Sequence, residues 1–337
     1  MSLLLGTSKY RNAQLSPDGK YISYNRPSGD TGVYNVFVKE LPAPGSAAAA
    51  ADKRSLFDRE GIDKDIQVTF DKKRGITSGT WGQDGKSMAY IQDTDGDENF
   101  HLFLVPLADT FKSGAKAAPP PVDATPFKGV KASGIMSSKN RPGILYIGLN
   151  KRSKEVFDLY RLDLKTMKLT LDTVNPGGLT TWLPDYGFNI RAALGYNNTD
   201  GSTYVLINDA PPTTDAAVAA APDLDALFSA AKEQNYTTAQ WIAASASKAD
   251  ASKWRRLITW PFGEKGGVFR FNKQGNGLYI VTSIDRDTTE FQLVSLQPGA
   301  KVIKRIASNP LVNVGSVWFE EDSWEPQMVS FNYLRYV

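Results

Sequence analysis

A short pattern that recurs along the whole chain constrains the fold more than any other feature. Each copy is a polar turn containing Gly or Pro, followed by a run rich in aromatic and β-branched residues. Asp-Gly and Asn-Gly pairs favour tight hairpins because glycine accepts positive φ without a Cβ clash. The turns occupy residues 16–19, 82–85, 138–143, 198–201, 273–277 and 321–326. The strand-like runs that follow them are residues 21–24, 87–91, 144–147, 203–207, 278–281 and 327–331.

In most copies a second turn and a further strand follow, so each repeat predicts three or four short strands. The repeats begin roughly 45 to 75 residues apart, which is typical of propeller blades. No helical segment intervenes regularly between the strands, and this argues against a parallel α/β fold. The sequence therefore predicts an all-β chain. It is a β-propeller of four-stranded antiparallel blades over residues 1–337, with about five complete blades and an incomplete sixth.

Three segments interrupt this rhythm. Residues 42–51 and 114–121 are rich in Ala, Pro and Gly and are predicted to be surface loops with no packing role. Residues 209–252 form an Ala- and Pro-rich insertion within the fourth blade. In it Leu224, Leu227, Phe228 and Ala231 recur at helical spacing, so we expect a partly helical insertion, either packed on the propeller or offered to a partner.

Composition removes several classes of function. The sequence contains no cysteine, which excludes disulfides, thiolate metal sites and a cysteine nucleophile, and its one histidine cannot supply the usual zinc ligand set. Lys and Arg number 39 against 36 Asp and Glu, and this small excess is scattered, so no nucleic-acid partner is expected. The opening residues are too short for a secretory or membrane-spanning segment. An intracellular location, cytoplasmic or organellar, and no membrane association are expected.

Several strings together carry a family resemblance. The most specific is Gly96-Asp-Glu-Asn99 in its second-blade context, supported by Asp84-Gly-Lys86 and by Asp158-Leu-Tyr-Arg161. From about residue 14 onward the chain resembles the N-terminal propeller of the prolyl oligopeptidase family of serine peptidases, especially its acylaminoacyl-peptidase and dipeptidyl-peptidase-like branch. The resemblance implies about seven blades. It thus predicts that this sequence is a fragment, a truncated product or one piece of a larger assembly.

In that family the propeller lies as a lid over an α/β-hydrolase domain that follows it and carries a Ser, Asp and His triad. No Gly-x-Ser-x-Gly nucleophile elbow occurs in this sequence. We therefore expect a non-catalytic, substrate-gating region that is inactive by itself, with no catalytic residue, cofactor or metal. Its expected partner is a hydrolase domain in cis or a protein that completes the propeller, and peptides are possible ligands. The alternative is a scaffold or interaction subunit derived from such a propeller.

The resemblance implies that Arg74, Glu98 and Asn99 contact the terminus of a peptide in the substrate channel. Three other patterns favour structural interpretations. An EF-hand calcium loop that began at Asp93 would need glycine at its sixth position and glutamate at its twelfth, where this sequence has Glu98 and Leu104. His101 lies on an alternating strand with no serine elbow near it, and the pair Glu320 and Glu321 falls on a hairpin turn, where surface charge is common.

Overall fold

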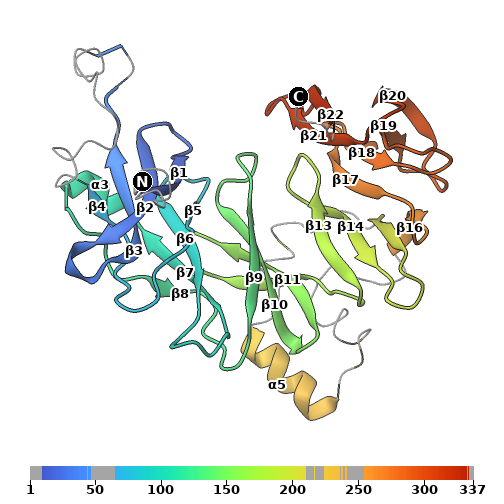
Figure 1. The fold of residues 1–337 in the computed structure, drawn as a ribbon. Helices are drawn as coiled ribbons and strands as arrows, with labels where there is room; N and C mark the ends of the chain where they lie inside the picture. Colours follow the sequence, from blue (N-terminus) through green and yellow to red (C-terminus); the bar gives the residue numbers. More distant parts are fainter. Residues whose placement is uncertain are drawn as a thin grey trace. The chain divides into compact units, whose positions relative to one another are not determined.

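The fold consists of short antiparallel sheets that follow one another along the chain (Figure 1). A computed structural model describes residues 10–43, 45–46, 65–209, 216, 224–235, 237, 240, 254–331 and 333. Within these residues there are five four-stranded sheets and one two-stranded sheet. In each four-stranded sheet every strand pairs with the next one in sequence. This up-and-down order is that of a propeller blade, and it confirms the predicted fold class.

The strands of the six sheets have the following bounds. The first two sheets contain β1 (Arg11–Leu15), β2 (Tyr21–Ser28), β3 (Val33–Glu40), β4 (Ile66–Gln67), β5 (Thr80–Trp81), β6 (Ser87–Gln92), β7 (His101–Pro106) and β8 (Val122–Asp123). The third and fourth contain β9 (Ala132–Ser137), β10 (Ile144–Ser153), β11 (Val156–Asp163), β12 (Leu169–Thr173), β13 (Leu179–Pro184), β14 (Ile190–Tyr196), β15 (Thr203–Asn208) and β16 (Trp254–Trp260). The last two contain β17 (Gly266–Phe271), β18 (Gly277–Thr282), β19 (Glu290–Ser295), β20 (Val302–Ser308), β21 (Val314–Phe319) and β22 (Pro326–Phe331).

The chain divides into two compact units. The first comprises residues 1–155 and 161–169, and the second comprises residues 156–160 and 170–337. The first and second sheets lie in the first unit, and the fourth, fifth and sixth lie in the second. The third sheet is divided between them.

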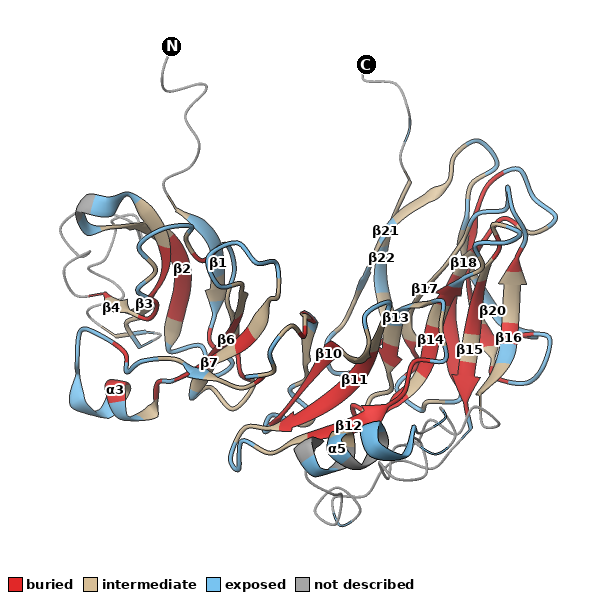
Figure 2. Cartoon of the chain, turned by 90° about the horizontal axis from the view of Figure 1, so that it is seen from below, coloured by how far each residue is buried: buried red, intermediate tan, exposed pale blue. Residues whose placement is uncertain are grey.

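The core of each unit comes from the middle strands, as the sequence pattern of apolar runs predicts. Figure 2 shows buried residues concentrated in strands such as β2, β14, β15 and β18. In the first unit Val38, Met88 and Val105 are fully buried in one cluster. In the second, Trp260 and Phe271 lie in another cluster, and the Trp260 indole donates a hydrogen bond to the Thr282 hydroxyl at 2.9 Å. Removing these apolar surfaces from water is the main stabilising contribution.

The segment 114–121 differs from the prediction that it has no packing role. Ala118 is buried in the core cluster of the first unit. The backbone of Gln67 in β4 donates to the Lys116 carbonyl at 2.9 Å and accepts from the Ala118 amide at 2.8 Å. These bonds join the outer strand of the first sheet to the β7–β8 connection of the second, which also contains helix α3 (Ala108–Ser113). The segment therefore has a packing role, through the buried Ala118 side chain and these two backbone bonds.

The insertion in the fourth sheet lies between β15 and β16 and contains helix α5 (Leu224–Gln234). Most of residues 209–252 fall outside the described residues, as do the side chains of Leu224, Leu227 and Ala231. Phe228 is half-buried and Ser229 is exposed. At the base of the insertion, Arg255 forms a two-pronged ion pair with Asp209, in which Nη2 lies 3.1 Å from Oδ1. The same nitrogen donates to the carbonyl of Leu296, in the β19–β20 connection, at 2.5 Å.

Candidate functional site

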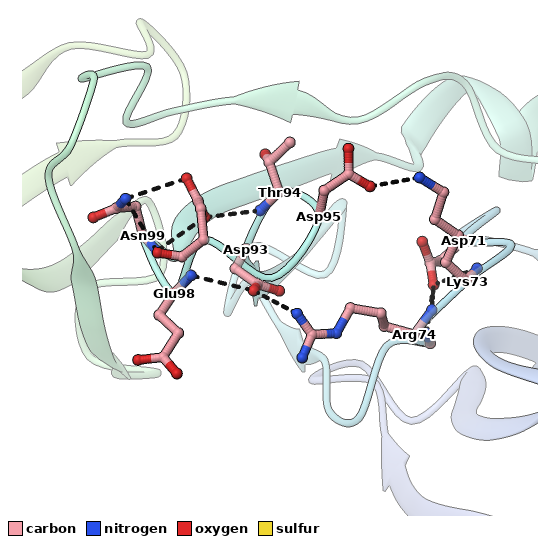
Figure 3. A network of polar contacts seen from close by, with 10 residues as sticks. Asp71, Lys73, Arg74, Asp93, Thr94, Asp95, Glu98 and Asn99 are labelled. Carbon is pink, nitrogen blue, oxygen red and sulfur yellow. Dashed lines mark hydrogen bonds and ion pairs between the residues drawn. The ribbon is translucent and has the colours of Figure 1, made fainter.

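The three predicted site residues come together in the first unit. Arg74 lies in the loop 71–75, which follows the first sheet. Glu98 and Asn99 lie in the connection between β6 and β7 of the second sheet. Figure 3 shows this connection, which we call the acidic hairpin (residues 93–99), beside the loop 71–75. The two segments are joined by ion pairs from Arg74 to Asp93 and from Lys73 to Asp95.

The loop that presents Arg74 is organised by Asp71. Its carboxylate accepts hydrogen bonds from the backbone amides of Lys73 at 3.2 Å, Arg74 at 2.8 Å and Gly75. Gly75 has φ of +84°, and a Cβ there would lie 2.9 Å from the Tyr34 carbonyl oxygen, so only glycine fits without a shift. Partial burial opposes ionisation, but the amide hydrogen bonds prevail and lower the pKa of Asp71. The loop is thus fixed by an ionised carboxylate.

The Arg74 guanidinium binds Asp93 through one edge, and the side chain is otherwise exposed to solvent. Its Nη1 lies 2.8 Å from Oδ2 of Asp93, whose side chain is only 7% exposed, whereas the Arg74 side chain is 56% exposed. A Cβ on Gly96 would come within 2.7 Å of this Nη1, so glycine leaves room for the guanidinium. Beyond Asp93, the guanidinium donates to no other described residue. Its remaining donors are therefore available to a ligand oxygen.

Glu98 and Asn99 complete the acidic hairpin. Glu98 has φ of +58°, its amide lies 3.4 Å from the Asp93 carboxylate, and its side chain is exposed. Figure 3 shows the Glu98 carboxylate directed away from the network, and it pairs with no side chain in the described part of the chain. Asn99 instead binds Asp97 through its backbone amide at 3.0 Å and its side-chain amide at 3.2 Å. These bonds, the side-chain one first, lower the pKa of Asp97.

These side chains can bind a ligand that has both a positively charged group and a carbonyl or carboxylate oxygen. The Glu98 carboxylate presents acceptors for an ammonium group, and the open edge of Arg74 presents donors for a carbonyl or carboxylate oxygen. Asn99 positions Asp97 in this structure, so its side chain is occupied within the hairpin. Sequence reasoning did not identify Asp71 and Asp93 as the residues that orient Arg74. The signal available was a run of carboxylates beside Gly75 and Gly96, without any indication of which one faces the arginine.

The lone histidine has a structural environment. His101 begins β7, and its Nδ1 lies 2.7 Å from Oδ2 of Asp123 on β8. The other oxygen of Asp123 accepts the backbone amide of Thr125 at 2.9 Å. The His101 side chain is 20% exposed, and its ring stacks near Phe103. The pair thus joins the two strands at the edge of the second blade.

The pair Glu320 and Glu321 was predicted to be surface charge on a hairpin turn. Glu320 and Glu321 lie at the β21–β22 turn, where the Glu320 carboxylate accepts the amides of Asp322 and Ser323. No group of His, Asp or Glu in the described ranges has the arrangement needed to hold a metal ion. Within the same ranges no helix combines the length and the apolar character needed to cross a membrane.

The fifth blade has a matching connection that sequence reasoning missed. Its β18–β19 hairpin ends at Glu290, whose side chain is only 5% exposed. The two carboxylate oxygens bind Arg286, at 3.2 Å, and Arg305. The Gln292 side-chain amide donates to the same carboxylate. Here the charged groups are satisfied by one another within the blade.

The five four-stranded meanders define the described chain as blades of a β-propeller. No family model matches the chain. Dipeptidyl aminopeptidase BIII of Pseudoxanthomonas mexicana is 30% identical over 203 residues, which cover 60% of this chain and 25% of that protein. Dipeptidyl peptidase family member 6 of Caenorhabditis elegans is 25% identical over 191 residues, covering 57% and 23%. The β-propeller domain of the Trilobed protease from Pyrococcus furiosus superposes with a TM-score of 0.45 at 12% identity, covering 92% of this chain and 72% of that one.

These relatives confirm the resemblance found in the sequence. Both curated relatives are named as dipeptidyl peptidases, and the chain is similar to them over 203 and 191 residues. It spans about a quarter of the length of the curated relatives that it matches.

Proposed function

We propose that this chain is the substrate-gating propeller of a prolyl-oligopeptidase-like serine peptidase and hydrolyses nothing by itself. The observation that carries the proposal is the similarity over 203 residues to a dipeptidyl aminopeptidase, in a sequence without a nucleophile elbow. The pairing of His101 with Asp123 across β7 and β8 agrees with a structural histidine. In this proposal the hydrolase domain acts in cis or is supplied by a second protein, and the propeller admits short peptides.

The acidic hairpin and Arg74 are the proposed contact for the end of a peptide. Glu98 would pair with a free amino terminus, and Arg74 would donate to a carbonyl oxygen of the same peptide. An exposed charge-assisted contact of this kind contributes about 1 kcal/mol, or roughly a fivefold change in affinity. The proposed role for Asn99 is to hold Asp97, and with it the shape of the hairpin, through the 3.2 Å bond.

Inactivity is tested by incubating the purified chain with dipeptidyl and acylaminoacyl p-nitroanilides and with a fluorophosphonate probe. We expect no turnover above buffer and no covalent labelling, because an activated serine is required for both. Turnover that the fluorophosphonate abolishes would overturn the proposal.

Peptide recognition is tested by fluorescence anisotropy with a short neutral peptide labelled at its carboxyl end. The free-amine form should bind better than its acetylated form, and Glu98→Gln should weaken binding roughly fivefold while removing the difference between the two. Glu40→Gln, a change of another exposed glutamate in the first unit, is the matched control. Equal binding of the two peptides to the unaltered chain would contradict this contact.

Gating is tested with the same amino-terminal sequence carried by a folded domain. The chain should bind the free peptide and not the folded fusion. Tight binding to folded proteins with no preference for free peptides would favour the scaffold alternative instead.

A further inference from the structure

A dense group of basic residues lies next to the acidic hairpin in the first unit. Residues 127–131 and 150–154 are ten residues that include five cations and no acidic side chain. This composition contrasts with the near balance of 39 basic and 36 acidic residues in the whole chain. We call these two segments the basic cluster. Its cations are Lys128, Lys131, Lys151, Arg152 and Lys154.

Backbone and side-chain contacts bring the two segments together. Asn150, only 8% exposed, accepts the Lys131 amide at 2.6 Å through its side chain and donates its own amide to the Lys131 carbonyl at 3.2 Å. The Lys154 ammonium donates to the Gly129 carbonyl. The Lys151 ammonium lies 3.5 Å from the centre of the Phe127 ring, so a cation–π contact also joins the two segments. The sequence scatters these lysines over two segments, and folding collects them.

The basic cluster continues directly from the proposed peptide contact. Asn99 is followed by Phe100, whose carbonyl accepts the Ala132 amide at 2.7 Å. The Lys131 ammonium lies 5.2 Å from the centre of the Phe100 ring. Phe100, two residues after Glu98, thus contacts both Lys131 and its neighbour Ala132. The acidic hairpin and the first segment of the basic cluster are therefore joined through Phe100.

We propose that the basic cluster binds acidic side chains of a peptide whose amino terminus lies at Glu98, and so selects acidic peptides as ligands. This inference rests on the proposed function. A peptide with a free amine followed by Asp or Glu residues has the charge order complementary to this surface, because its positive end meets Glu98 and its carboxylates meet the lysines. Lys128 and Lys154 are both exposed and can reach a ligand without rearrangement of the core.

A peptide fits this surface better than a nucleic acid. Single-stranded nucleic acids are bound by stacking their bases on open aromatic faces. Here lysine ammonium groups lie over the faces of Phe100 and Phe127. The exposed carboxylates of Asp95 and Glu98 would also repel a phosphate backbone that extended past the cluster.

The test compares three probes of matched length on the complete 337-residue chain. One peptide has a free amino terminus, two neutral residues and a run of Glu. A second has Gln in place of each Glu, and the third probe is oligothymidylate. We expect the Glu peptide to bind about tenfold better than the Gln peptide at low salt, because two or three exposed ion pairs add to that extent. The difference should nearly vanish at ~1 M salt, where the Debye length is about 3 Å.

Variants locate the effect. Lys128→Gln with Lys154→Gln should bring the Glu peptide close to the affinity of the Gln peptide and leave the Gln peptide unchanged. The matched control is Lys301→Gln with Lys304→Gln, two exposed lysines near β20 in the second unit. Lys128→Glu alone is a second variant, because Lys128 is exposed and its replacement should not affect folding.

Equal affinities of the Glu and Gln peptides, no detectable binding of the Glu peptide, tighter binding of oligothymidylate, or an equal loss in the control variant would each overturn the inference. These outcomes are separable from failure of the proposed function. If the Gln peptide binds through Glu98 and Glu adds nothing, only the basic cluster is refuted. If the Glu preference persists but no binding depends on Glu98, only the terminal contact is refuted.

Discussion

The second and fifth blades use the same connection, between their second and third strands, in opposite ways. In the fifth blade the Glu290 carboxylate is 5% exposed and binds two arginines. In the second blade the Glu98 carboxylate is exposed and is directed away from the network that supports it (Figure 3). Charges that are satisfied within a blade stabilise it, whereas charges held in place but left open to solvent can recognise something else. The two connections occupy the same position in the repeat, so the comparison distinguishes charges that stabilise a blade from charges that can bind a ligand.

The largest effect is expected from Glu290→Ala. The substitution leaves Arg286, whose side chain is 31% exposed, beside a buried space without its anion. Breaking a buried ion pair costs about 3 to 5 kcal/mol, and partial exposure of the arginines reduces this to roughly 2 to 3 kcal/mol. Urea unfolding should show the loss as a lower midpoint with an unchanged slope. The matched change Glu98→Ala should cost less than ~0.5 kcal/mol. Equal losses would erase the distinction between the two hairpins.

Gly96→Ala should have an intermediate effect. Gly96 has φ of +88°, and its new Cβ would lie 2.7 Å from Arg74 Nη1. We expect a loss of about 1 kcal/mol from the backbone conformation together with displacement of Arg74 from Asp93. Gly85→Ala is the control, because Gly85 has φ of +67° but no atom within 4 Å of the added Cβ. Both variants should lose stability in thermal unfolding, and only Gly96→Ala should also lose peptide affinity.

Acid should loosen the loop that carries Arg74. The pKa of Asp71 is lowered in the folded chain by the amides of the loop, against the effect of burial. A lowered folded pKa contributes stability that is fully present above the unfolded value near 3.8 and is lost as the pH falls through the folded pKa. Loop order followed by amide exchange or NMR should therefore decline below a pH of about 4. Asp71→Asn should remove this decline. An unaltered loop at low pH would contradict the role of the ionised carboxylate.

The smallest effect on folding is expected from Glu98→Gln. Its carboxylate is exposed and pairs with no described side chain, so the free energy of unfolding should change by less than ~0.5 kcal/mol. Thermal unfolding checks this directly. A clear loss of stability would place Glu98 among the structural charges, as in the fifth blade.

Much of the architecture could be predicted from local sequence. Turns such as residues 16–19 and 273–277 separate β1 from β2 and β17 from β18, because Gly and Asp favour the same hairpin conformations wherever they occur. The two-residue strands β4 and β8 could not be predicted from their local sequence. They depend on pairing with distant strands, as does the burial of Ala118. A short Ala- and Pro-rich segment carries no periodicity that would indicate such contacts.

The candidate site could be predicted only in part. The acidic hairpin was recognisable as a turn, and the resemblance indicated Arg74 as a residue close to it. Which carboxylate would hold Arg74 was not predictable, because Asp93 and Asp95 are two residues apart and bind different partners, Arg74 and Lys73. The buried position of Glu290 was equally hidden, since Arg286 and Arg305 approach it from two separate segments. Such pairings are set by tertiary geometry rather than by composition.

The Asp209–Arg255 ion pair has a consequence for how this chain can change in length. It lies where β15 ends and β16 begins, so the residues between them leave and rejoin the fourth sheet at a single point. A loop whose ends are already joined can be lengthened at small entropic cost, about 0.6 kcal/mol for each doubling. The base of the insertion, where these two side chains pair, is therefore a suitable place to insert a tag or a new module into the blade, or to shorten the chain.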